Sequence, residues 1–380
     1  MNLIKLPALI DPHVHFRTPG ATHKEDWISG AKAAIAGGVT TVFDMPNTHP
    51  TTTTYARLLE KKALIDSQLK EAGIPLRYRL FFGADKNQFP ELNQLHQAKA
   101  LIAGVKVFMG SSTGDLLMDD EASLDILFKT CAELNLLVAV HAENEAMIRA
   151  RTTELQCDDF ACHSQIRSPE VAAKALSQAI NLTRKYGTKL YALHIGSRLE
   201  LEMLHQAKLE GLPIWIEIAP HYLFLDTTRY ADLKGKAQMN PPLREPADCE
   251  FLWEAIRLGW IDTIGSDHAP HPLHDKSEAY CKCPSGVPGV QTTLPLLLNA
   301  YHQGKITLDQ ISELTHHAPK RIFNLPDHDD YVLVDLDLEK TVTRDLLYSK
   351  AGWSPYEGMR LRGWPIETLL AGKSYDPSRL

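Results

Sequence analysis

The stretch LIDPHVHFR, residues 9–17, joins an apolar run to a polar cluster that contains two histidines one residue apart. An apolar run of this length, ended by polar residues, is typical of a buried strand. Side chains at positions i and i+2 of a strand point the same way, so His13 and His15 would face one cavity together. The pattern indicates either a histidine-lined metal site or an ordinary polar strand end. Other parts of the sequence are needed to distinguish these two explanations.

The same order recurs along the chain, with a short apolar run, a polar tip and then an amphipathic helical stretch. The strand-like runs are ALIDPHVH, TTVFDMPN, LRYRLFFGAD, GVKVFMGS, LLVAVHAEN, KLYALHIGS, PIWIEIAPH and IDTIGSDHAP. Apolar strands that alternate with helices favour a parallel sheet covered on both faces. Eight such units predict an α/β fold, a TIM-like (β/α)8 barrel. A doubly wound open sheet is the alternative, but no glycine-rich phosphate-binding sequence follows the first strand.

The barrel is expected to occupy residues 1–325, and residues 326–380 to form a small C-terminal β appendage packed on it. Within that appendage YVLVDLD has the pattern of a strand outside the barrel, and further short strand patterns follow. Only ten residues precede DPHVH, so no N-terminal half of a β-sandwich is expected. Two loop-like stretches, residues 110–116 and 272–285, could each be a lid or a plain connection, and the sequence leaves this open.

The composition of the 380 residues, 44% hydrophobic and 23% charged, is typical of a globular protein. A net charge of −7 gives no reason to expect binding to nucleic acid or to an anionic membrane. No apolar run approaches the roughly 20 residues of a membrane-spanning helix, and the apolar start of the chain is too short for a secretory signal. A cytoplasmic protein is therefore expected. Six scattered cysteines favour reduced thiols over a disulfide framework.

Polar residues also end later strands of the predicted barrel, with His141 on the fifth, His194 on the sixth and Asp267 on the eighth. In such a barrel the carboxyl ends of the strands form the face that carries the active site. Together with His13 and His15, this face would hold four imidazoles and a carboxylate. Nitrogen and oxygen ligands without a thiolate suit zinc or a similar transition metal. A single histidine at a strand end is usually structural, so the metal prediction depends on their joint placement.

Three further histidines also lie at strand ends. His268 and His271 cluster with Asp267 at the end of the eighth strand, and His221 ends the seventh, where packing or an outer contact is expected rather than metal binding. Nine histidines lie on predicted helices or loops, show no such convergence and are expected outside the site: His23, His49, His96, His163, His205, His302, His316, His317 and His328.

Lys106 interrupts the apolar run GVKVFMG, where its ammonium would be buried among Val105, Val107 and Phe108. Burial favours the neutral form of a lysine. One explanation is a salt bridge to a buried carboxylate. The other is carbamylation, in which the neutral amine reacts with carbon dioxide to give a carboxylate that can bridge two metal ions.

Taken together, the motifs DPHVHFR, DMPNT, VKVFMG, VHAEN, LHIGS, MNPPLR and GSDHAPH resemble the cyclic-amidohydrolase branch of the amidohydrolase superfamily, and most of all the dihydroorotase family. The resemblance covers nearly the whole chain. It implies a zinc-dependent enzyme of de novo pyrimidine biosynthesis, which reversibly hydrolyses L-dihydroorotate to N-carbamoyl-L-aspartate through a hydroxide that bridges two zinc ions. A hydantoinase or allantoinase with the same metal centre is one alternative. An inactive barrel that serves as a scaffold for aspartate transcarbamoylase is another.

The resemblance also assigns residues. It implies two zinc ions per chain bridged by carbamylated Lys106, with the metal ligands His13, His15, Lys106, His141, His194 and Asp267. Asp267 would also be the catalytic acid–base group. The implied substrate contacts are Arg17, Asn47 and His271 for the substrate carboxylate, and Asn240 and Gly286 for the ring. The implied partners are the small-molecule substrate and either further copies of the chain or aspartate transcarbamoylase.

Two features depart from the longer dihydroorotases, many of which have an aspartate at the bridging position and a complete β-sandwich. Here the bridging position holds Lys106, and little chain precedes the first barrel strand. These departures leave the subclass open.

Overall fold

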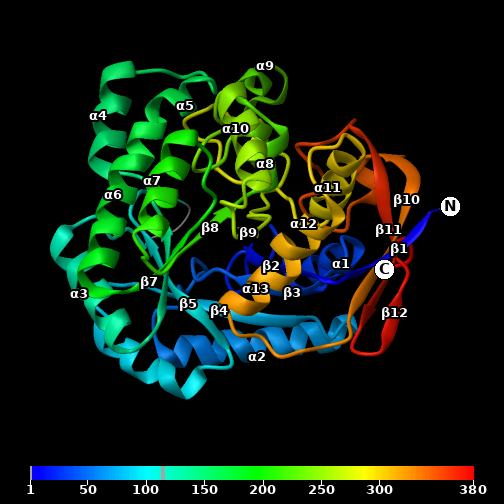
Figure 1. The fold of residues 1–380 in the computed structure, drawn as a ribbon, viewed down its shortest axis with the longest axis horizontal. Coiled ribbons are helices and arrows are strands. Elements are labelled where there is room, and N and C mark those ends of the chain that lie inside the picture. The colour runs from blue at the N-terminus through cyan, green and yellow to red at the C-terminus, as the bar shows by residue number, and fades with distance from the viewer. Residues whose placement is uncertain (1, 113–115) are drawn as a thin grey trace.

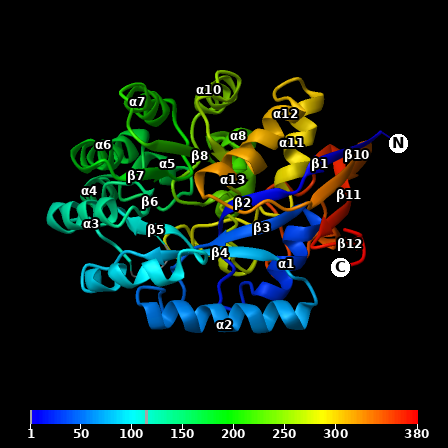
Figure 2. The same cartoon turned by 60° about the horizontal axis from the view of Figure 1, so that its bottom comes forward.

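A computed structural model describes residues 2–112 and 116–380 of the protein. Its centre is an eight-stranded sheet in which each strand pairs in parallel with the next along the chain (Figures 1 and 2). The strands are β2 Leu9–Val14, β3 Val39–Asp44, β4 Arg77–Gly83, β5 Ile102–Phe108, β6 Leu137–His141, β7 Lys189–Ala192, β8 Ile214–Ile218 and β9 Thr263–Ile264. A parallel bridge between Val14 and His268 joins the first strand to the segment after the last. The predicted (β/α)8 barrel is confirmed.

Helices surround the barrel, as the view in Figure 2 shows. The α-helices are α1 Trp27–Ala36, α2 Tyr55–Ala72, α3 Glu121–Glu133, α4 Glu145–Leu155, α5 Cys162–Ile166, α6 Pro169–Tyr186, α7 Arg198–Leu209, α8 Pro220–Phe224, α9 Tyr230–Leu233, α10 Pro246–Arg257, α11 Thr293–His302, α12 Leu308–Ser312 and α13 Ala318–Ile322. Short 3₁₀ segments cover Phe89–Ala98, Thr227–Arg229, Lys234–Ala237, Asp275–Ser277 and Arg344–Leu346, and a π-helical turn covers Glu313–His317. Both faces of the sheet are therefore buried, which explains its apolar strands.

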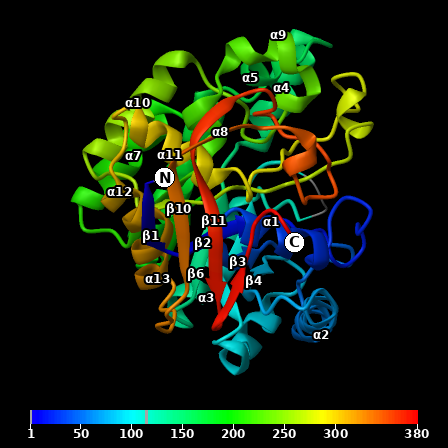
Figure 3. The ribbon, with the colours of Figure 1, turned by 90° about the vertical axis from the view of Figure 1, so that its right-hand side faces the viewer.

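A second, four-stranded antiparallel sheet lies beside the barrel, with the order β1-β10-β11-β12 (Figure 3). Its strands are β1 Leu3–Pro7, β10 Tyr331–Thr341, β11 Arg360–Leu370 and β12 Lys373–Tyr375. The expectation of no N-terminal contribution was wrong, because Leu3 to Pro7 pair along β10 and bury Leu6. The appendage is thus built from both ends of the chain.

The second sheet packs on the barrel through α11. Gly363 of β11 has φ 97° and approaches Leu298 so closely that an added Cβ would lie 2.6 Å from the Leu298 Cβ. A side chain could not fit there, and the left-handed φ favours glycine as well. Thr368 of β11 also donates a hydrogen bond to the carbonyl of Ile35 in α1. These contacts attach the sheet away from the carboxyl ends of the barrel strands.

A disulfide joins Cys157 and Cys162 in the turn between α4 and α5. The expectation of reduced thiols was therefore wrong for this pair. The turn brings the two Cα atoms to 6.2 Å, within the range that a disulfide spans, although spacing along the sequence did not indicate it. The free thiols are those of Cys131, Cys249, Cys281 and Cys283. Within the described part of the chain, no helix is both long and apolar enough to cross a membrane.

Candidate metal centre

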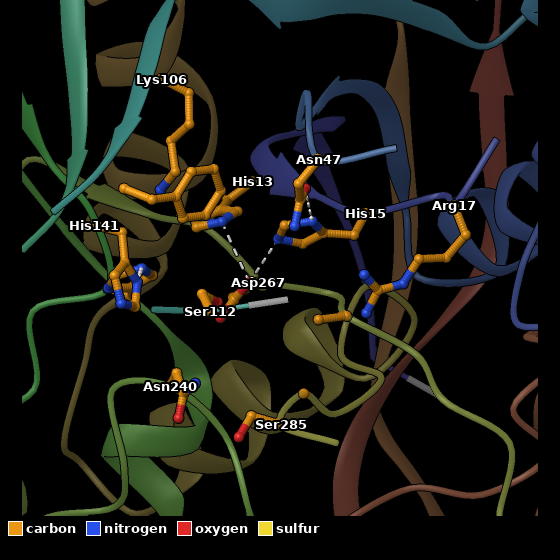
Figure 4. Close-up of a pocket in the computed structure, with 14 residues that line it drawn as sticks. His13, His15, Arg17, Asn47, Lys106, Ser112, His141, Asn240, Asp267 and Ser285 are labelled. Carbon is orange, nitrogen blue, oxygen red and sulfur yellow. Dashed lines mark hydrogen bonds and ion pairs between the residues drawn. The ribbon is translucent and has the colours of Figure 1, made fainter. Parts of the chain in front are cut away.

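A cavity opens at the carboxyl ends of the barrel strands (Figure 4). The structure brings ten of the eleven predicted site residues to its wall: His13, His15, Arg17, Asn47, Lys106, His141, His194, Asn240, Asp267 and Gly286. Phe108, Ser112, Ala269 and Ser285 complete the lining. Residues that are far apart along the chain therefore converge because the parallel strands all end on this face.

His13, His15 and Asp267 form the first cluster. The Oδ1 atom of Asp267 lies 3.2 Å from His13 Nε2 and 3.3 Å from His15 Nε2. One potential ligand atom of each residue lies within 4.8 Å of the others, and all three side chains are buried. Burial alone would raise the pKa of Asp267, but the two neighbouring histidines hold it well below its usual value. Two imidazole nitrogens and an ionised carboxylate form a donor set that fits zinc.

The outer ring nitrogens of the first cluster are held by oxygen acceptors. His13 Nδ1 lies 2.8 Å from Glu217 Oε1, and His15 Nδ1 lies 2.9 Å from Asn47 Oδ1. Because both partner atoms are oxygens that accept, each Nδ1 carries a hydrogen, and each Nε2 is the ring nitrogen that faces Asp267 and could bind a metal ion. This arrangement prepares an imidazole to bind a metal ion. Glu217 also accepts a bond from the backbone N–H of His194, so it supports both sides of the cavity.

His141, His194 and Lys106 form the second cluster. His141 Nδ1 lies 3.1 Å from His194 Nε2 at the cavity wall. The other nitrogen of His141, Nε2, lies 2.9 Å from Glu143 Oε2, which in turn pairs with Arg167. Burial lowers the pKa of both histidines, so both rings are neutral at pH 7. Two neutral imidazole nitrogens at this separation can share one metal ion.

Lys106 is 1% exposed, and its side chain reaches from β5 toward the histidines (Figure 4). Among the described residues, its Nζ atom has neither a hydrogen-bond acceptor nor a carboxylate within salt-bridge distance. The ring centroid of Phe108 lies 4.6 Å away. Burial lowers the pKa of Lys106 to about 7, so a large share of the amine is neutral at pH 7. The explanation by a salt bridge therefore finds no partner in the described part of the chain, and the amine fits carbamylation.

Three site residues other than glycine have a left-handed backbone, which such residues seldom adopt. The φ angles are 59° at Arg17, 41° at His194 and 46° at Asp267. Each such conformation costs on the order of 1 kcal/mol, and proteins concentrate this cost at functional sites. Here the turned backbone directs each side chain from a strand end toward the cavity.

Arg17 lines the cavity, whereas His271 lies behind it. Arg17 Nε donates to the carbonyl of Pro270, and its Nη2 lies 3.2 Å from His271 Nε2. The same His271 nitrogen lies 3.1 Å from the carbonyl of Ser285, and Lys24 Nζ lies 3.1 Å from His271 Nδ1. Because the Ser285 carbonyl only accepts, Nε2 carries the hydrogen and Nδ1 accepts from Lys24. Arg17 has only donors, so its contact with this Nε2–H is not a hydrogen bond. Burial holds the pKa of His271 well below its usual value, and a neutral ring therefore lies behind Arg17.

Three side chains that hold site residues from behind were not predicted. Glu217 lies inside the apolar run of β8, a position as unusual as that of Lys106, and this signal could have identified it. Glu143 lies two residues after His141, so a ligand-supporting role could have been inferred from the spacing. His163 was expected outside the site, yet its ring contacts Asn240. Its short helix gave no periodic signal that could have revealed this contact.

The two candidate lids differ in what the structure describes. Residues 113–115 of the first lie outside the described residues, and Ser112 beside them lines the cavity. The second stretch, residues 272–285, contributes Ser285 to the lining. Both stretches therefore border the cavity.

The sequence matches the amidohydrolase family over residues 4–328. The chain belongs to this family. As an amidohydrolase it is a hydrolase, and members of the family typically depend on a metal ion, which accords with the first cluster.

Curated relatives resemble this amidohydrolase along almost its whole length. A dihydroorotase from Halobacterium salinarum is 35% identical over 376 residues, which are 97% of this chain and 85% of that protein. The multifunctional protein CAD from Squalus acanthias is 33% identical over 98% of this chain, but only 15% of that protein is matched.

Solved structures resemble it as well. The L-hydantoinase (dihydropyrimidinase) from Arthrobacter aurescens has a TM-score of 0.91 and 28% identity, and the match covers 98% of this chain and 85% of that one. The amidohydrolase thus shares its fold with hydantoinases and more of its sequence with dihydroorotases.

Proposed function

We propose that this amidohydrolase is a dihydroorotase, which reversibly hydrolyses L-dihydroorotate to N-carbamoyl-L-aspartate. The observation that carries the proposal is the guanidinium of Arg17 in the wall of the cavity, beside the first cluster. Dihydroorotate carries a carboxylate on its ring, and a planar guanidinium suits a carboxylate. Hydantoin and allantoin have no such carboxylate. Curated dihydroorotases that are 33% to 35% identical over 97% to 98% of the chain support the same conclusion.

The same proposal includes two zinc ions. His13, His15 and Asp267 would hold one, His141 and His194 the other, and carbamylated Lys106 would bridge them. Bound there, the ions would polarise the amide carbonyl of the substrate and lower the pKa of water. Four neutral imidazoles and one carboxylate compensate two dications poorly, which is why a second anion is needed.

Carbamylation of Lys106 would supply that anion. The neutral amine attacks carbon dioxide, an N–C bond forms, and one proton leaves to solvent. The product is a carboxylate at the end of the lysine side chain. The buried Nζ atom of Lys106, which has no hydrogen-bond partner among the described residues, supports this step.

In the hydrolytic direction, Arg17 and Asn47 would hold the substrate carboxylate and so fix the ring against Asp267. The oxygen of water bonds to the C4 ring carbonyl carbon, and the bond from that carbon to the ring nitrogen breaks. Asp267 would take a proton from the water and deliver it to the leaving nitrogen. Asn240 and Gly286 would contact the ring from another part of the wall. Ring closure of N-carbamoyl-L-aspartate would use the same groups in reverse.

The fold similarity to hydantoinases makes a hydantoinase or allantoinase the second candidate. Comparing turnover of L-dihydroorotate, hydantoin and allantoin by the zinc-loaded protein tests both. We expect dihydroorotate to be hydrolysed with the highest kcat/KM. Faster hydrolysis of hydantoin or allantoin would favour the second candidate. Loss of all three activities together with a lack of bound zinc would instead favour an inactive scaffold.

Assembly, location and domain division stay predictions. The multifunctional relatives place the matched segment within a much longer chain, which is consistent with a role beside other enzymes. Light scattering of the protein alone, and mixed with aspartate transcarbamoylase, distinguishes self-association from association with that enzyme. A cytoplasmic location and a barrel that ends near residue 325, with β1 as part of the appendage, complete the proposal.

A further inference from the structure

Asn240 forms part of the cavity wall, and one side of its amide is held from behind. Its Oδ1 atom lies 2.8 Å from His163 Nε2. The same ring nitrogen lies 3.0 Å from the backbone carbonyl of Met239. His163 belongs to α5 and is 4% exposed, so water does not compete freely for these contacts.

The carbonyl of Met239 settles where the hydrogen of His163 lies. A backbone carbonyl only accepts, so Nε2 must carry a hydrogen. The Asn240 atom beside this N–H must then be the amide oxygen, whichever way the amide would otherwise be drawn. The orientation of Asn240 therefore follows from a backbone atom.

Tyr280 fixes the opposite side of the imidazole. Its hydroxyl lies 3.0 Å from His163 Nδ1, and the two rings meet edge to face with centroids 5.6 Å apart. Burial, together with the nearby Arg167 guanidinium, lowers the pKa of His163 to about 4. The ring is consequently neutral at pH 7, and Nδ1 accepts the hydrogen of Tyr280. The contact holds His163 in one tautomer.

With its oxygen held by His163, Asn240 presents its NH₂ group in the opposite direction from Cγ. Figure 4 shows the amide oxygen directed away from His141 and Asp267. An NH₂ group donates and cannot accept. A ligand group that meets this part of the wall must therefore be an acceptor, such as a carbonyl oxygen.

We propose that His163, held by Tyr280, is a positioning residue that turns the Asn240 amide so that the cavity selects a ring carbonyl oxygen. The inference rests on the proposed function, in which the substrate is a six-membered cyclic ureide. Such a ring has a carbonyl between two ring nitrogens, and this oxygen is present in both the closed ring and the open ureido product. One fixed donor would thus serve both directions of the reaction.

The test compares L-dihydroorotate with its 2-thio analogue, in which sulfur replaces that oxygen. Sulfur accepts hydrogen bonds weakly, so the wild-type protein should have a kcat/KM at least about tenfold higher for the oxygen compound. His163→Phe removes the N–H and releases Asn240. We expect KM for dihydroorotate to rise about tenfold, with a smaller change in kcat, and the oxygen-to-sulfur preference to fall toward one. His163→Gln can still donate and should restore most of the preference.

Two tyrosine variants provide a matched pair. Tyr280→Phe removes only the hydroxyl that fixes the tautomer, and it should lower the preference about two- to threefold. Tyr230→Phe removes a buried hydroxyl that contacts Ser164, the neighbour of His163 on α5, and should leave the preference unchanged. A general loosening of α5 would lower turnover of both substrates equally and would not move the ratio.

The inference is overturned if the preference is unchanged in both His163→Phe and Tyr280→Phe at wild-type Tm and zinc content. It is also overturned if the wild-type protein hydrolyses the two compounds equally well. If His163→Phe fails to fold, the Tyr280→Phe and Tyr230→Phe pair decides alone. A wild-type protein that does not hydrolyse dihydroorotate at all refutes the proposed function instead, so the two failures are distinguishable.

Discussion

The two clusters of the cavity hold similar histidines but differ in their anions. In the first cluster the Asp267 carboxylate already lies within 3.3 Å of both imidazoles. In the second cluster His141 and His194 lie 3.1 Å apart, and the third member, Lys106, is an amine with no partner among the described residues. The comparison shows that one cluster already holds a carboxylate beside its imidazoles, whereas the other holds two imidazoles and an amine.

The supports behind the clusters also differ. Glu143 holds His141, and Arg167 offsets its charge. Glu217 holds His13 and accepts from the Tyr191 hydroxyl, and within the described residues no lysine or arginine pairs with it. Glu217 therefore has no paired cation among the described residues, and a carboxylate of this kind would strengthen the His13 imidazole as a metal ligand.

Asp267→Asn should have the largest effect on activity, because it removes the carboxylate of the first cluster. The amide keeps the shape but loses both the anionic ligand and the proton acceptor. We expect kcat for L-dihydroorotate to fall at least about 1,000-fold, within the range for losing an acid–base group. Measuring the rate of L-dihydroorotate hydrolysis and the zinc content in the same samples checks this prediction. Activity near the wild-type level would mean that the first cluster is not the reacting centre.

Lys106→Ala should have the second-largest effect on activity, because it removes the side chain whose carbamate would be the anion of the second cluster. A loss larger than the roughly 10- to 100-fold typical of an outer contact is expected, with partial recovery when short carboxylic acids are added. Full activity without rescue would contradict the bridging assignment.

Lys61 offers a matched control for the modification itself. It is as buried as Lys106, but its Nζ atom lies 2.6 Å from a carboxylate oxygen of Asp44. Carbon-13 NMR with labelled bicarbonate should therefore show one carbamate signal, which Lys106→Ala removes and Lys61→Arg keeps. A signal that survives Lys106→Ala would place the carbamate elsewhere.

The sequence could predict much of the cavity because parallel strands place their ends together. His13, His15, His141 and His194 each end an apolar run, so the barrel alone brings them to one face. The periodicity of side chains cannot extend past a strand, however. His271 lies four residues beyond Asp267, after the chain has turned at Pro270, and its side chain lies behind Arg17.

Long-range pairing explains other differences. β1 was missed because its partner β10 lies more than 300 residues away, and nothing local in LIKLP identifies that partner. The roles of Glu217 and His163 depend on which side chains they meet across the barrel. Such contacts follow from packing of the whole fold, and hydrophobic periodicity carries no information about them.

Glu217 and Glu143 hold His13 and His141 from behind, and comparing Glu217→Gln with Glu143→Gln tests whether these two carboxylates differ in effect. Each removes a negative charge that holds an imidazole, and each should weaken zinc binding by about 10- to 100-fold. We expect the larger loss for Glu217→Gln, because Arg167 already offsets Glu143. Competition with a chelator measures both affinities. Equal losses, or the reverse order, would show that the offsetting charge has no influence on the ligand.

The smallest expected effect belongs to Arg17, which is a member of neither cluster. Arg17→Met should raise KM for L-dihydroorotate about tenfold, or about 1.4 kcal/mol of binding, and leave the zinc content unchanged. Arg17→Lys keeps the charge but loses the planar guanidinium. Its KM should therefore lie between that of the wild-type protein and that of Arg17→Met. The contrast with Asp267→Asn separates substrate binding from metal binding. If KM does not change, the substrate carboxylate is held elsewhere or is absent, and a substrate of the hydantoin type would explain the cavity better.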